Sequence, residues 1–390
     1  MTSQARTVPR AVPAYATGTA GEAVAQLVGD LRDGLAGRRA AALLYFASSA
    51  YDPADVVPVI SSHFPLTVTV GCSTAGEFTH LHNGTGGIAA VALPDGLLSN
   101  AAAALGELGK GAGEGTADAV QSLEERIQVQ LRHLDPDRHL GIMLVDGLHG
   151  SEEQVNEMLG NAAPLLDFVG GSAGDDLAFE RTWVAVGDKV SHHGVALMVC
   201  QSAVPFRVVK TCSFTSTGKA LRITRADVPS RTVLEFNGRP ATEAYAEAIG
   251  VPVEELGTGT WVGHPVGLMI DGEPWIRSPL EVVPAGGLRF YAQILPGMEV
   301  EVMRSGDLVG ETATALRRAR AELGGRSSGA VLFNCVLRRL ETDAGNASAA
   351  FVAALGGMPS AGFHTYGESW LGHMNQTLTG VVFGSEPVLR

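Results

Sequence analysis

The sequence has few cysteines, and no two of them are close enough in the sequence to form a motif. Its 390 residues contain four, Cys72, Cys200, Cys212 and Cys335, each isolated among largely apolar neighbours. No C-x-x-C pair occurs, which excludes zinc ribbons, thioredoxin-like redox motifs and c-type haem attachment. Isolated cysteines of this kind are typical of a reducing compartment, where the thiol serves as a small core side chain. We therefore expect the cysteines to be reduced core residues.

Basic residues are in the minority, and long apolar runs are missing. The chain has 28 lysines and arginines against 41 acidic residues, which gives a net charge of −13. This balance disfavours nonspecific attraction to nucleic acid or anionic lipid. No stretch approaches the roughly eighteen apolar residues that a membrane span needs, and the first residues lack the apolar core of a signal peptide. The sequence therefore predicts a cytoplasmic protein with no membrane span and no nucleic-acid partner.

Glycine is abundant instead, with 49 residues, and it marks a repeat. The stretches 41–78, 141–176 and 330–370 each read as a strand, a short helix, a second strand and a glycine-rich turn. In the second stretch Ser151 and Gln154 form a capping-box pattern, so its helix is expected to begin there. Repeats of this kind predict an α/β fold with mixed sheets built from β-α-β units that end in glycine-rich acidic turns.

The three turns share their chemistry. Gly71 to Glu77 and Gly362 to Glu368 have glycine, threonine, glycine and glutamate at matching positions, and Gly170 to Asp175 is a shorter copy. Strand-end turns face the ligand crevice in open α/β sheets, and glycines there let backbone N–H groups approach an anion. Hydroxyls and carboxylates add partners for polar and cationic groups. The alternative is that these turns only reverse the chain.

A ligand site at the turns would draw on a specific set of residues. The expected ligand-binding residues are Gly71, Ser73, Thr74, Glu77, Gly171, Ser172, Asp175, Thr365, Tyr366, Glu368 and Asn375.

The length of the chain predicts about two domains. After Cys212 the pattern shifts to turn residues and charges, which places a boundary near 215–230. The expected organisation is an N-terminal tail and helix over 1–37, a first domain over 38–220 and a second domain over 221–390.

Seven motifs occur in order along the chain: "GCSTAGEF", "LVDGLHGSEE", "VGGSAGDD", "EFNGRPATEAY", "FNCVLRRL", "AGFHTYGE" and "MNQTLTG". Together they resemble the FIST family of prokaryotic sensory proteins, with its paired N-terminal and C-terminal regions. The resemblance implies a non-catalytic input module of signal transduction that binds a small ligand such as an amino acid. It also implies a separate output partner, a histidine kinase or a cyclic-dinucleotide enzyme, because the chain carries no kinase or cyclase motif.

Some stand-alone members of that family are haem-based nitric-oxide sensors, so haem b is a second ligand that the resemblance implies. An axial haem ligand needs only one histidine beside an apolar slot. His373 and His264 are the candidates, because each lies amid glycine and aromatic residues in the C-terminal half.

A hydrolase that transfers acyl or amide groups through Ser172 or Cys72 is the competing class. Residues 170–174 formally match the G-x-S-x-G elbow, but that motif needs a helix directly after the serine, and the following residues read as turn and strands. We therefore expect a sensor in which ligand binding shifts a domain-closure equilibrium.

Overall fold

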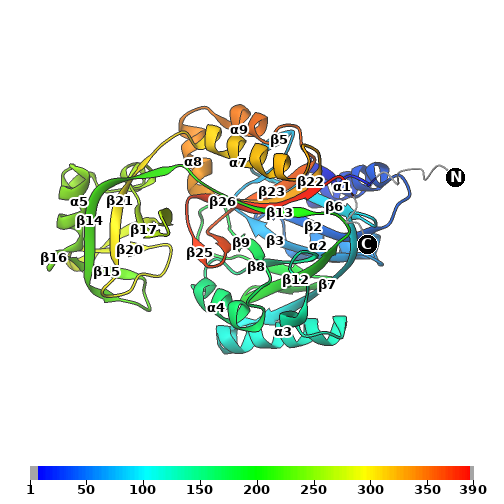
Figure 1. Cartoon of the computed structure of the whole chain (residues 1–390), viewed down its shortest axis with the longest axis horizontal. Coiled ribbons are helices and arrows are strands. Elements are labelled where there is room, and N and C mark those ends of the chain that lie inside the picture. The colour runs from blue at the N-terminus through cyan, green and yellow to red at the C-terminus, as the bar shows by residue number, and fades with distance from the viewer. Residues whose placement is uncertain (1–7, 387–390) are drawn as a thin grey trace.

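The structure is a computed structural model that describes residues 8–386 (Figure 1). Within these residues it contains three six-stranded sheets, which share one plan, and one eight-stranded sheet. In each six-stranded sheet two parallel strands from a β-α-β unit lie at the centre, two further strands extend one side, and a short hairpin extends the other. The expected α/β fold with mixed sheets is therefore confirmed.

The first sheet is built on the unit over 40–74. Its strands, in spatial order, are β1 (Val12–Thr17), β6 (Gly87–Pro94), β2 (Ala40–Ser48), β3 (Val68–Thr74), β10 (Val184–Val186) and β11 (Lys189–Ser191). Helix α2 (Pro53–His63) joins the parallel strands β2 and β3, and α1 (Ala20–Leu35) packs beside it. Helix α2 begins as expected for its sequence, because Asp52 accepts a 2.9 Å hydrogen bond from the N–H of Ala54.

The second sheet repeats this plan. Its order is β7 (Leu98–Glu107), β12 (Gly194–Ser202), β8 (His139–Val145), β9 (Phe168–Ser172), β24 (Glu368–Trp370) and β25 (His373–Met374). Helix α4 (Glu152–Ala162) joins the parallel strands β8 and β9, and α3 (Ala112–Ile127) packs beside it.

The third sheet contains the last unit of the chain. Its order is β13 (Phe206–Cys212), β26 (Thr377–Gly384), β22 (Ser327–Cys335), β23 (Ser360–Thr365), β4 (Glu77–Thr79) and β5 (His82–Gly84). Helices α8 (Val336–Ala344) and α9 (Ser348–Ala354) join β22 and β23, and α7 (Leu308–Glu322) packs beside α9.

The three units exchange their hairpins in a cycle. The hairpin β4–β5 follows the first unit but pairs with β23, β24–β25 follows the third unit but pairs with β9, and β10–β11 follows the second unit but pairs with β3. Phe46, Leu144 and Phe333, one from each sheet, belong to one buried core cluster. This exchange brings the three glycine-rich turns to one place.

The fourth sheet is antiparallel in all its described pairings and forms a separate domain over residues 214–305, which we call the lateral domain. It lies to the left of the three-sheet body in Figure 1. Its strands are β14 (Phe214–Asp227), β15 (Thr232–Phe236), β16 (Arg239–Pro240), β17 (Val266–Ile270), β18 (Glu273–Arg277), β19 (Pro279–Val283), β20 (Gly287–Phe290) and β21 (Glu299–Ser305). Helices α5 (Ala241–Ile249) and α6 (Thr258–Gly263) belong to it, and the aromatic rings of Phe236 and Tyr245 fill its own core.

After the lateral domain the chain returns to the body to complete the third sheet. Residues 12–35, expected as a tail and helix, form β1 and α1 of the first sheet.

Candidate functional site

The three glycine-rich turns, which we call the hub turns (71–77, 170–175 and 362–368), meet as the sequence suggested, and they hydrogen-bond to one another. The N–H of Ala75 donates to the carbonyl of His364 at 3.0 Å, and the N–H of Gly174 donates to the carbonyl of Ser73 at 3.1 Å. The N–H of Tyr366 donates to the carbonyl of Ser172 at 3.1 Å. Backbone donors that were expected to face a ligand are therefore used within the hub.

Glycines in the hub permit this close approach. A Cβ added to Gly171 would lie 2.5 Å from Cγ2 of Thr365, and one added to Gly174 would lie 2.8 Å from Cβ of Ala75. Both distances are shorter than real Cβ contacts, so side chains at these positions would push the turns apart.

The two matching glutamates are buried and internally paired in the same way. Glu77 accepts from the hydroxyl of Thr74 and from the N–H of Gly87 at 3.0 Å. Glu368 accepts from the hydroxyl of Thr365 and from the N–H of Thr377 at 3.0 Å. Burial raises the pKa of Glu77 to about 8 and that of Glu368 to about 7, although the threonine hydrogen bonds oppose the shift.

Asp175 in the shorter turn has a different role. Its carboxylate accepts from the N–H groups of Phe179, Glu180 and Arg181, at 3.0, 2.6 and 2.9 Å. The hydroxyl of Tyr366 donates to the same carboxylate. Asp175 therefore folds the segment 176–181 back on itself, and φ angles of 55°, 70° and 55° at Asp176, Leu177 and Phe179 show how tightly that segment turns.

The remaining hydroxyl, amide and thiol candidates are also enclosed. The Ser73 hydroxyl accepts from the N–H of Trp183 at 3.0 Å, and the Ser172 hydroxyl donates to Glu152 at 3.2 Å. Asn375 accepts from the N–H of Ser278 at 3.3 Å. Cys72 lies in the core between the sheets, where burial raises the pKa of its thiol. Ser172 and Cys72 both have no exposed surface, so neither is placed to meet a substrate in this conformation.

The two histidines proposed as haem ligands lie in different surroundings. His373 is 2% exposed, and its ring contacts Gly367, where an added Cβ would come within 2.0 Å of Cε1. Its neighbourhood is charged, with Glu152, Glu153, Arg231 and Arg277 all acting on it. His264 ends α6, with Nδ1 3.3 Å from the carbonyl of Thr260. The charged surroundings of His373 do not fit the apolar slot that haem requires.

The largest of the described cavities lies elsewhere, at the carboxyl end of β8, and has a volume of about 550 Å³. Its lining residues are Asp146, Leu148, His149, Glu180, Arg181, Thr182, His192 and His193. They come from the loop 146–151 that joins β8 to α4, from the segment that Asp175 folds back, and from the turn before β12. The carboxyl ends of parallel strands are where open α/β sheets bind ligands.

A buried carboxylate supports the cavity wall. Asp146 accepts from the Thr182 hydroxyl at 2.5 Å and from the N–H of Leu148 at 2.9 Å, and Nδ1 of His193 lies 3.3 Å from its second oxygen. Nδ1 of His192 donates to the carbonyl of Thr182 at 2.8 Å. Among residues 8–386 the Nε2 atoms of His192 and His193 have no hydrogen-bond partner, so both rings can serve a ligand.

Ser151 also contributes to this wall. The capping-box prediction was wrong here, because the Ser151 hydroxyl contacts Nδ1 of His149 and makes no hydrogen bond to the helix. The imidazole two residues earlier competes for the hydroxyl, and the loop conformation places the two side chains together. As a result His149 is tied directly to the first residue before α4.

Opposite charges stand side by side at the cavity. Glu180 and Arg181 both line it, and neither forms an ion pair within the described part of the chain. Their backbone N–H groups are fixed on Asp175, while their side chains are exposed. In the same range, no group of three or more histidine, cysteine, aspartate or glutamate side chains is arranged to hold a metal ion.

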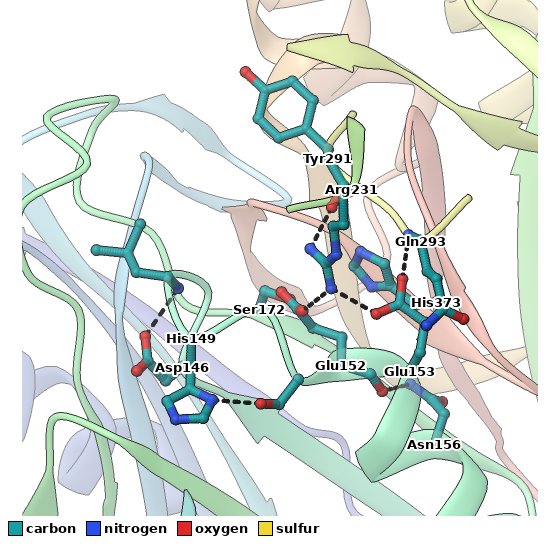
Figure 2. A network of polar contacts seen from close by, with 12 residues as sticks. Asp146, His149, Glu152, Glu153, Asn156, Ser172, Arg231, Tyr291, Gln293 and His373 are labelled. Carbon is teal, nitrogen blue, oxygen red and sulfur yellow. Dashed lines mark hydrogen bonds and ion pairs between the residues drawn. The ribbon is translucent and has the colours of Figure 1, made fainter. Parts of the chain in front are cut away.

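The other end of the loop 146–151 contacts the lateral domain (Figure 2). Nη2 of Arg231 lies 2.6 Å from Glu152 and 2.5 Å from Glu153, the first two residues of α4. The N–H of Gln293 donates to Glu153 at 2.6 Å. Burial disfavours the ionised form of Glu153, but His373, Arg231 and the Gln293 N–H outweigh it, so the pKa of Glu153 is lowered. The junction between body and lateral domain therefore combines an ion-pair cluster with hydrogen bonds such as that from Ser278 to Asn375.

Sequence reasoning missed this cavity. The motif that contains Asp146 and His149 was visible, and so was the pair His192–His193, but about 40 residues separate them. A signal did exist: Asp146 directly follows a buried strand of the second β-α-β unit, at the edge where a ligand crevice is expected.

Body and lateral domain together make this a two-domain α/β protein with a polar cavity at a strand end. The FIST N domain matches residues 41–239 and the FIST C domain matches residues 241–370. The chain belongs to the FIST family, whose domains are associated with small-ligand sensing in signalling. Within residues 8–386, no helix combines the length and apolarity needed to cross a membrane.

Similar proteins add little about the ligand. An uncharacterised protein of Methanocaldococcus jannaschii is 24% identical over 286 residues, which are 68% of this chain and 54% of that protein. The chain thus spans about half the length of the curated relative it matches.

Two solved structures are similar over almost the whole chain. A cyanuric acid hydrolase from A. caulinodans covers 97% of it and 100% of its own length, with 11% identity and a TM-score of 0.35. A chorismatase covers 97% and 99%, with 10% identity and a TM-score of 0.34. At these scores the likeness carries no argument about the activity of this chain.

Proposed function

We propose that the protein is a cytoplasmic sensor of a small, polar, amino-acid-like ligand, which binds in the cavity at the carboxyl end of β8. The observation that carries this proposal is the pair of opposite charges at one cavity of about 550 Å³, Glu180 and Arg181, neither of which forms an ion pair with any of residues 8–386. The volume lies within the range of about 300–1,000 Å³ that small-molecule sites occupy.

The cavity offers a partner for each end of a zwitterion. The Arg181 guanidinium matches a carboxylate, which it can bind through two parallel hydrogen bonds. Glu180 and the free Nε2 atom of His193 accept hydrogen bonds from an ammonium group. Asp146 holds the His193 ring in place through Nδ1 and thereby directs that acceptor.

The hub turn over 170–175 supports the site from behind. Gly147 in the cavity loop lies against Ala173, where an added Cβ would come within 2.1 Å of the Ala173 carbonyl oxygen. Asp175 shapes the segment that carries Glu180 and Arg181. In this proposal the acidic turn therefore positions the site and does not touch the ligand. The bound state is then read by a separate partner, a histidine kinase or a cyclic-dinucleotide enzyme.

Calorimetric titration with each of the twenty amino acids tests the proposal. We expect at least one to bind with a 1:1 stoichiometry, and Arg181→Ala to weaken that binding at least tenfold. Arg132→Ala, which removes an exposed arginine that does not line the cavity, is the matched control and should bind as the unmodified protein does. Binding that survives Arg181→Ala unchanged would place the ligand elsewhere.

A further inference from the structure

Glu153 lies between two sets of partners at the junction with the lateral domain. Its carboxylate is held by Nη2 of Arg231 at 2.5 Å and by the N–H of Gln293 at 2.6 Å, both from the lateral domain. On the body side the imidazole of His373 lies beside it (Figure 2). Both partners from the lateral domain are lost when that domain moves away, whereas His373 stays with the body.

The His373 ring is buried without any hydrogen bond. Neither Nδ1 nor Nε2 has a partner among residues 8–386, although the residue is 2% exposed. Buried polar atoms are normally paired, and an unpaired one calls for an explanation. Only the His373 backbone is engaged, because its carbonyl accepts from Nη1 of Arg277 at 3.0 Å. Both ring nitrogens of His373 are therefore available for a new hydrogen bond.

Four charged groups face this ring from the elements packed against it. Glu152 and Glu153 come from α4, Arg231 comes from the turn between β14 and β15, and Arg277 comes from the end of β18. In the docked arrangement the two carboxylates and two guanidinium groups balance, so the imidazole is not needed as a cation. Removal of the lateral domain takes both arginines away and leaves two carboxylates beside the ring.

We propose that His373 is a switch residue that replaces Arg231 as the partner of Glu153 when the lateral domain leaves, so that the junction has a docked and a released state. This inference rests on the proposed function in one respect, because we assign the choice between the two states to the ligand in the β8 cavity.

The loop 146–151 connects the cavity to this switch. His149 lines the cavity and contacts Ser151, and the next two residues are Glu152 and Glu153. Gly150 lies against Arg231, since a Cβ added there would be 4.0 Å from its Cζ. A ligand that draws His149 toward itself therefore acts on the start of α4 and on the ion pairs made there.

The switch also makes docking depend on pH. In the docked state burial lowers the pKa of His373, the two arginines lower it further, and the glutamates oppose them. The released state binds the proton more readily, because the arginines are gone and Glu153 is free to pair with the imidazolium. Docking is therefore strongest above the ordinary histidine pKa of about 6.5 and weakens as the pH falls below it.

Hydrogen exchange of the full-length protein tests the switch without any ligand. Protection factors, which correct for the intrinsic effect of pH, are compared at pH 7.5 and 5.5 for peptides that cover 149–156 and 288–295. We expect protection to fall at least fivefold at pH 5.5 in the unmodified protein and to stay constant in His373→Gln. His139→Gln, at a half-buried strand end, is the matched control and should respond as the unmodified protein does.

An equal loss of protection in the unmodified protein and in His373→Gln would overturn the switch. Should that variant fail to fold, the titration of the His373 ring is followed by NMR in the unmodified protein. A ring that titrates together with the exposed histidines, without a change in protection at the junction, overturns the switch as well.

Ligand dependence is examined separately, with the twenty amino acids at 1 mM and pH 7.5. A change in protection at the junction in the unmodified protein but not in Arg181→Ala supports the coupling. A normal pH response with no ligand response at any amino acid would count against the proposed ligand and leave the switch standing. Ligand binding at the cavity without any change at the junction would overturn the coupling alone.

Discussion

The loop after β8 and the junction after β22 occupy equivalent places in two β-α-β units, yet they differ in what they enclose. After β22 the chain enters α8 directly, with no intervening residue. Arg338 from that helix fills the space, fully buried, with hydrogen bonds to Asn334 at 2.8 Å and Thr312 at 2.6 Å. After β8 six residues, 146–151, separate strand and helix, and a cavity of about 550 Å³ lies beside them. In the first unit four residues, 49–52, lie between β2 and α2, so the candidate site lies beside the longest of the three loops.

The hub turns, in contrast, contain a feature that is repeated. Thr74 with Glu77 and Thr365 with Glu368 repeat the same hydrogen bond, and both pairs are buried and internally satisfied. A feature that recurs in equivalent places of a repeated fold serves what the copies share, which here is the packing of three units around one centre. Function is then expected in the features that do not recur.

The largest effect is expected at Arg231, which pairs with the first two residues of α4. Arg231→Ala removes the guanidinium group that pairs with both Glu152 and Glu153 in a largely buried site, and breaking such a pair costs about 3 kcal/mol or more. Urea denaturation followed by the fluorescence of Trp261 and Trp275 measures the loss in the lateral domain. The matched control is Arg239→Ala, which removes an exposed ion pair with Glu247 and should leave the transition unchanged. Equal urea transitions for the two variants would contradict a structural role for Arg231.

A second prediction addresses the repeated hub. Gly171→Ala forces a methyl group to within 2.5 Å of Cγ2 of Thr365, so we expect a loss of about 2 kcal/mol in the free energy of unfolding. Gly113→Ala is the control, because Gly113 lies in α3 with open space around its Cβ position. That substitution should stabilise the protein by up to about 1 kcal/mol. Thermal denaturation of both variants shows whether hub glycines are required for packing.

The buried glutamates give a pH-dependent effect. The folded-state pKa of Glu77, about 8, lies above its ordinary value of 4.5, so the folded state holds the proton more tightly. Its contribution to stability is therefore complete below pH 4.5 and is lost as the pH rises through 8. Glu77→Gln imitates the protonated form and should reduce the decline in Tm between pH 5 and 8. The same decline in the variant would show that Glu77 is not the group responsible.

Much of this architecture was predictable from the sequence. The three β-α-β units and their turns follow from hydrophobic patterning and glycine spacing, both of which are local. The hairpin exchange was not predictable, because Phe78 pairs with Gly362 across 284 residues of chain and the strand pattern does not specify the partner. The similar position of the three turns at strand ends suggested that they meet. The hydrogen bonds from one turn to the carbonyl groups of the next depend on the hairpin exchange and were not predictable.

The candidate site shows the same limit. Asp146 carries a local signal, because it directly follows a buried strand, but its convergence with Arg181 on one cavity depends on how Asp175 folds the segment 176–181. The switch role of His373 depends on a junction between two domains. The sequence shows that a histidine is present, but not that both of its ring nitrogens are buried without a hydrogen bond among residues 8–386.

At the cavity itself a small stability effect should accompany a large binding effect. His149 is exposed, so we expect His149→Ala to change the free energy of unfolding by less than about 0.5 kcal/mol. Binding of any amino acid found by calorimetry should weaken about tenfold, the loss expected for one good hydrogen bond to a charged group. A variant that binds normally would remove His149 from the site.

The smallest effect is expected from haem. Because the His373 ring is buried among four charged side chains, added haem should give the absorption spectrum of free haem, with or without nitric oxide. A sharp, saturable Soret band that disappears in His373→Ala would contradict this expectation and restore the haem-sensor hypothesis.

The hydrogen-exchange footprint of a bound amino acid on the full-length protein shows most directly whether the ligand binds at the loop 146–151 or at the hub turns. We expect added protection in peptides that cover 146–151 and 179–193, with the hub turns unchanged. Protection confined to 71–77, 170–175 and 362–368 would contradict it and would assign the ligand to the turns.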